Sequence, residues 1–119
     1  MLANPFVRRT LLAGYVAAML AALLMPVPAT PSYLPGAFDK LAHVGLFLGF
    51  AVLAAWNARG GRGWRGLVAL GSAAAFAAVI EVLQALLPYR SGDPLDLVAG
   101  VAGGIVGAVV GGLTDAPDQ

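Results

Sequence analysis

The chain has 119 residues, of which 60% are hydrophobic and 11% are charged, and its formal net charge is +1. A soluble domain of this size needs more polar surface than this composition supplies, so the sequence predicts an integral membrane protein. The small net charge gives no case for nucleic-acid binding. The absence of cysteine excludes disulfide bonds and cysteine catalysis.

The apolar residues fall into four runs, each long enough as a helix to cross a bilayer core of about 30 Å. Segments rich in proline, or in glycine and arginine, separate these runs and cannot be helical throughout. The sequence therefore predicts an all-α fold, an integral membrane four-helix bundle in which residues 1–119 form a single domain. The expected helices cover about residues 10–25, 39–57, 66–87 and 95–113.

The first run has a second interpretation. Arg8 and Arg9, followed by an apolar run and small residues, are also typical of a secretory signal peptide that would be cleaved near residue 29. The run is at the long end for a signal, and Pro31 crowds the cleavage site, so we favour a retained helix. In both interpretations the second run begins at the outer face of the membrane.

Positive charges are divided unequally between the connecting segments. If the N-terminus is cytoplasmic, the outer segments hold only Lys40 and Arg90, and the inner segments hold all the other basic residues. This excess predicts that the N- and C-termini are both cytoplasmic. The basic residues expected at the inner face are Arg8, Arg9, Arg59, Arg62 and Arg65.

This orientation places the polar residues of three helices in the outer half of the membrane and leaves the inner half almost purely apolar. Asp39 and His43 are four residues apart and share one helix face, so the aspartate can accept the ring N–H of the histidine. Glu81 and Gln84 share another face. A glutamate inside the membrane is costly unless it is paired or faces water, which indicates an outward-facing polar pocket.

The candidate ligand-binding residues of this pocket are Asp39, Lys40, His43, Glu81, Gln84, Arg90 and Asp96. Each also has a structural interpretation. Asp39 and Asp96 suit the first turn of a helix, Lys40 suits an interfacial anchor, and Glu81 suits an ion pair with Arg90, Lys40 or His43. No ligand-dense metal motif is present, so we expect neither a metal nor a cofactor.

The fourth run contains glycines at repeated spacings of four residues, which allow helices to approach closely in lipid. We interpret them as packing residues, with homo-oligomerisation through the glycine-rich helix 95–113 as the alternative, and expect the second run to supply the matching groove through Gly45 and Gly49. The glycines are Gly100 with Gly104, and Gly103 with Gly107 and Gly111.

The segments "FDKLAHVGLFLGFAVL" and "EVLQALLPYRSGDPLDLVAGVAGGIVGAVVG" resemble the VanZ-like family of small bacterial membrane proteins over about residues 38–112. The family pattern has Asp-Lys-x-x-His at the start of one helix and Glu-x-x-Gln near the end of the next. An arginine-containing turn and an Asp at the start of the last helix follow. This chain has Gly100 where the pattern commonly has Asn.

The resemblance implies a multi-pass protein of the bacterial cytoplasmic membrane that is linked to low-level resistance to teicoplanin-type glycopeptides. Three functions stay open. The pocket binds an envelope lipid headgroup or a lipoglycopeptide, which we favour. Alternatively, the protein is an enzyme acting on a lipid-linked envelope substrate, with His43 as base or nucleophile, Asp39 orienting it and Glu81 as general acid. In the third hypothesis, the polar residues only hold the four helices together, and the protein has a structural role in assembly with other membrane proteins.

Overall fold

The computed structural model describes residues 3–25, 36–88 and 94–114, together with the backbone but not the side chains of residues 36–39. Each of its four helices is long and apolar enough to cross a membrane. The prediction of an all-α, four-helix membrane bundle is confirmed. The helices are α1 (Pro5–Leu24), α2 (Gly36–Asn57), α3 (Arg62–Leu86) and α4 (Pro94–Leu113).

Helices α1 and α3 begin earlier than the sequence predicts, and each start has a local cause. The side chain of Asn4 accepts a hydrogen bond from Phe6 N at 2.9 Å, and Pro5 occupies the first turn, where its missing N–H costs nothing. Helix α3 begins at Arg62, directly after the turn made by Gly60, whose φ of 113° is a conformation that other residues rarely adopt. The connection between α2 and α3 is therefore shorter than expected.

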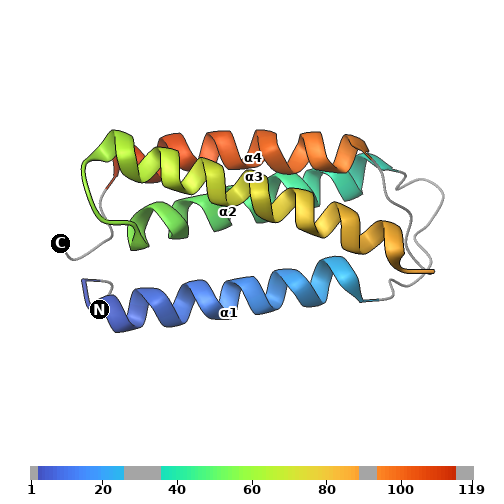
Figure 1. Cartoon of the computed structure of the whole chain (residues 1–119), viewed down its shortest axis with the longest axis horizontal. Helices are drawn as coiled ribbons and strands as arrows, with labels where there is room; N and C mark the ends of the chain where they lie inside the picture. The colour runs from blue at the N-terminus through green and yellow to red at the C-terminus, as the bar shows by residue number, and fades with distance from the viewer. Residues whose placement is uncertain (1–2, 26–35, 89–93, 115–119) are drawn as a thin grey trace.

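Helices α2, α3 and α4 form one tight group, and α1 lies along one side of it (Figure 1). Helix α4 packs most closely against α2, to which it runs parallel, and next against the antiparallel α3. Helix α1 contacts α2 and α3. We call the end of the bundle where α1 and α3 begin the arginine end, because Arg8, Arg9, Arg59, Arg62 and Arg65 lie there.

The contact between α2 and α4 depends on glycines. A Cβ atom on Gly103 would meet the backbone carbonyl oxygen of Val44, and one on Gly107 would meet that of Leu48. Gly111 continues the same face one turn further along α4. The two backbones touch because these three residues carry no side chain, as expected for small-xxx-small packing in lipid.

The remaining glycines of α4 face α3 or the junction of all three helices. A Cβ on Gly104 would lie 2.8 Å from Ala73 Cβ, and one on Gly112 would lie 3.2 Å from Gly66 Cα. Helix α4 therefore uses one glycine face for α2 and another for α3. The interpretation of the glycines as packing residues is confirmed within the chain.

The expectation that Gly45 and Gly49 form the matching groove on α2 is wrong. A Cβ on Gly45 would meet no atom within 4 Å, and Gly49 faces the side chain of Tyr15 in α1. The Tyr15 hydroxyl donates a hydrogen bond to Leu46 O at 2.7 Å. Helix α2 thus turns its own glycines away from α4 and presents the backbone at Val44 and Leu48 instead.

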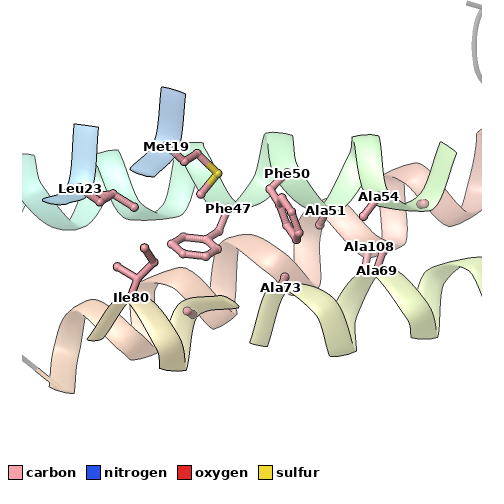
Figure 2. Packing of buried hydrophobic residues seen from close by; sticks show 12 residues of the cluster. Met19, Leu23, Phe47, Phe50, Ala51, Ala54, Ala69, Ala73, Ile80 and Ala108 are labelled. Atoms are coloured by element: carbon pink, nitrogen blue, oxygen red, sulfur yellow. The ribbon is translucent and has the colours of Figure 1, made fainter. Parts of the chain in front are cut away.

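The buried core changes in character along the bundle (Figure 2). Alanines, among them Ala51, Ala69 and Ala108, fill the narrow part between α2, α3 and α4. Larger side chains, among them Met19 of α1 and Phe47 of α2, fill the part that α1 covers. Small residues thus hold three helices close together, and bulky ones attach the fourth.

Arg65 closes the arginine end, and it lies in the first turn of α3, although the sequence predicts a helix that begins only at residue 66. The residue is buried, with 9% of its surface exposed. Its Nη1 donates to Ala55 O at 3.3 Å and Gly111 O at 3.4 Å, and its Nη2 donates to Gly112 O at 3.4 Å and Thr114 O at 3.2 Å. Ala55, Gly111 and Gly112 lie in the last turn of α2 or α4, and Thr114 directly follows α4. Ala55 O also accepts a hydrogen bond from Ala58 N at 3.3 Å.

We expect Gly107→Ala to lower the free energy of unfolding by about 1–3 kcal/mol, because the added methyl group collides with the backbone of α2. The matched control is Gly45→Ala, whose methyl group enters open space and should leave stability unchanged or raise it by about 0.4–1 kcal/mol. Both are measured by denaturant unfolding in the same detergent. Equal stability of the two variants would contradict the glycine contact.

Candidate functional site

Five of the seven predicted site residues have described side chains, and all five lie at the end opposite the arginine end. We call this group the polar layer; it consists of Lys40, His43, Glu81, Gln84 and Asp96. Arg90 lies outside the described residues. Asp39 is in the first turn of α2, but its side chain is not described.

The position of the layer is set by a junction of three helices at Gly100. A Cβ on Gly100 would lie 3.1 Å from Phe47 Cδ2 in α2 and 3.2 Å from Ala77 Cβ in α3. Phe47 is fully buried, so its ring forms the floor beneath the layer. This is the position at which the VanZ-like pattern has Asn, and here the aromatic ring lies against the space that an Asn side chain would need.

One helical turn beyond this junction, the three helices bring ionisable residues to one level. His43 precedes Phe47 by four residues on α2, and Asp96 precedes Gly100 by four residues on the parallel α4. Glu81 follows Ala77 by four residues on α3, which runs in the opposite direction. The convergence of α2, α3 and α4 therefore gathers residues that are up to 53 positions apart in the sequence (96 − 43 = 53).

Lys40 and Asp96 form an ion pair, with Lys40 Nζ 3.2 Å from Asp96 Oδ1. The Lys40 side chain is 30% exposed and that of Asp96 is 7% exposed. The carboxylate also lies in the first turn of α4, where the positive end of the helix dipole stabilises it. Lys40, one of the partners that the sequence suggests for Glu81, thus forms an ion pair with Asp96.

His43 is almost completely enclosed, with 2% of its surface exposed. Its ring stacks on Phe47 with a centroid distance of 6.3 Å and an interplanar angle of 17°. A side chain this buried presents little surface to a bound molecule. Lys40, whose side chain is 30% exposed, supplies accessible polar surface in the described part of the layer.

Gln84 has a structural role that the sequence does not reveal. Its Nε2 donates a hydrogen bond to Leu23 O in the last turn of α1 at 2.8 Å, and the residue is 1% exposed. Its Oε1 atom is buried and accepts no hydrogen bond. Gln84 therefore ties α1 to the rest of the bundle and leaves one polar atom available inside the layer.

Three members of the polar layer, His43, Gln84 and Asp96, are buried in the part of the chain that the structure describes. Among residues 3–25, 36–88 and 94–114, no three His, Asp or Glu side chains come together as ligands for a metal ion. Two surface hollows of those residues, of about 310 and 270 Å³, contain no member of the layer. The outward-facing pocket stays a prediction.

A double-mutant cycle tests the Lys40–Asp96 pair. We expect Lys40→Met alone to lower the free energy of unfolding by about 1–3 kcal/mol, between the values for exposed and for buried pairs, because it leaves the Asp96 carboxylate buried without this cation. In Lys40→Met/Asp96→Asn the carboxylate is gone as well, so stability should return towards that of the wild type. Strictly additive effects in detergent unfolding would contradict a coupled pair.

Comparison with known proteins identifies a family for nearly the whole chain. No curated protein and no solved structure matches the chain. A family model described as VanZ/LLP1 matches residues 5–114, which include all four helices and every residue of the polar layer. Because that match covers nearly the whole chain, the protein belongs to the VanZ/LLP1 family.

Proposed function

We propose that this protein binds the headgroup of an envelope lipid, or a lipoglycopeptide, at the polar layer, and that it thereby contributes to resistance to teicoplanin-type glycopeptides. The observation that carries the proposal is the convergence of ionisable side chains from α2, α3 and α4 at one end of a membrane bundle. Ionisable residues within membrane helices are costly, and a ligand is a common reason for retaining them.

The exposure of Lys40 favours binding over a purely structural role. Its ammonium group holds the nearly buried Asp96 carboxylate, yet 30% of the lysine side chain stays accessible. Lysine is a compact charge that binds phosphate or carboxylate. The half-buried Glu81 and the first-turn Asp96 favour cations, so a headgroup that carries both signs of charge suits the layer best.

The enzyme hypothesis takes second place because of the burial of His43. A base or nucleophile must touch the reacting atoms, and the His43 ring is 2% exposed and stacked on Phe47. Helix α2 does run unbroken through positions 39 and 43, which puts them one turn apart on one helix face. Loss of product formation in His43→Ala, on a lipid-linked substrate, would favour the enzyme over the binding protein.

The proposal requires the polar layer to lie at the outer face of the bacterial cytoplasmic membrane. The arginine end then faces the cytoplasm, as the positive-inside rule expects, with both termini on that side. A reporter that is active only in the cytoplasm should be active when it is fused after Gln119. Activity of a reporter that works only outside the cytoplasm would overturn this orientation.

Resistance is tested by expressing the protein in a susceptible Gram-positive host. We expect the wild type to raise the inhibitory concentration of teicoplanin, and Glu81→Gln and Lys40→Met/Asp96→Asn to lose most of that protection. The first change keeps the shape of the side chain, and the second removes both partners of the ion pair together. Protection is compared at matched amounts of protein in the membrane.

The matched control is Gly107→Ala, which weakens helix packing at a distance from the polar layer. Its protection should follow its amount in the membrane and should equal that of the wild type when the amounts are equal. If the polar-layer variants behave in the same way, the layer is scaffolding and the proposed binding site is wrong. A wild type that gives no protection would remove resistance from the proposal.

A further inference from the structure

A second candidate site lies at the arginine end, on the surface between α3 and α4. A groove of about 310 Å³ runs there, with walls that include Leu67 of α3 and Val109 of α4. The bottom of the groove is formed where Gly66 of α3 and Gly112 of α4 allow the two helix backbones to approach closely. A Cβ on Gly112 would lie 3.2 Å from Gly66 Cα. Gly63 also lines the groove, and a Cβ on it would meet no atom within 4 Å.

The groove has a cationic side chain in its lining. Arg62, the first residue of α3, is exposed and borders the apolar walls. The carboxylates with described side chains, Glu81 and Asp96, lie in the polar layer at the opposite end. The described part of the chain therefore places an apolar slot and an exposed guanidinium side by side, away from its described carboxylates.

We propose that this groove binds an anionic phospholipid, with one acyl chain in the slot and the phosphate on the Arg62 guanidinium. The first turn of a transmembrane helix lies near the membrane–water interface, which is the depth of lipid phosphates. Arginine binds phosphate through two parallel N–H donors, and it favours anionic over zwitterionic headgroups. The site is separate from the polar layer and does not depend on the function proposed for it.

A second copy of the chain fits this surface less well. Two copies with the same orientation in a membrane pair about a two-fold axis along the membrane normal, so each residue at the centre of the interface approaches its own counterpart. Pairing through this groove would bring the two Arg62 side chains close together, and like charges across an interface are unfavourable. A phospholipid supplies the opposite charge instead.

The headgroup contact is tested with the full chain in detergent, by native mass spectrometry with added phosphatidylglycerol or phosphatidylcholine. We expect the wild type to retain more phosphatidylglycerol, and Arg62→Gln to reduce that preference about fivefold, the value of one basic residue near an anionic surface. The matched control is Arg59→Gln, which removes an exposed arginine outside the groove and should keep the preference. Equal losses in both variants would show diffuse attraction and overturn the site.

The acyl-chain slot is tested by filling it. A Cβ on Gly63 would meet no atom within 4 Å, so Gly63→Leu adds a side chain to the lining of the groove, and we expect it to reduce retention of both lipids. Gly71→Leu is the matched control, because Gly71 is on the same helix, is equally free of neighbours and lies outside the groove. Unchanged lipid retention in a folded Gly63→Leu variant, judged by its melting temperature, would overturn the proposal. A dimer of the wild type that is dissociated by the Gly63→Leu substitution would also overturn the proposal.

Discussion

The direct contact between the backbones of α2 and α4 is the constraint on which the rest of this bundle depends. Because Gly103 and Gly107 have no side chains, α4 lies against the carbonyls of Val44 and Leu48. The same contact sets the register in which the beginnings of the two helices meet, and this register places Lys40 3.2 Å from Asp96. The packing of α4 against α2 in the middle of the bundle thus determines that Lys40 and Asp96 form an ion pair at its end.

Helix α3 holds the bundle together at both ends by binding carbonyl groups of its neighbours. At one end Arg65 donates to Ala55 O of α2 and Gly111 O of α4, and at the other Gln84 donates to Leu23 O of α1. The last carbonyls of a helix have no N–H of their own helix to bind, and lipid offers them none. Side chains of α3 therefore bind carbonyls at the C-terminal ends of the three other helices.

Composition and spacing were sufficient to predict the four spans and the group of polar residues at one end, because both follow from hydrophobicity and helical periodicity. They did not predict which face each helix turns to its neighbours. Gly45 has the expected spacing but faces open space, since the rotation of α2 is set by Tyr15 and by the glycines of α4. The glycine- and arginine-rich pattern places Arg65 in a connecting segment, and its burial cannot be read from the sequence because its hydrogen-bond partners are backbone carbonyls.

The junction beneath the polar layer links two positions on different helices. Gly100 and Phe47 share one volume, in which the ring occupies what a larger residue on α4 would need. A relative with Asn at the position of Gly100 has to accommodate that side chain by moving or shrinking the ring on α2. We therefore expect relatives with Asn at the position of Gly100 to have a smaller residue at the position of Phe47. The two positions together, rather than either residue alone, then show whether the surface beneath the polar layer is apolar or polar.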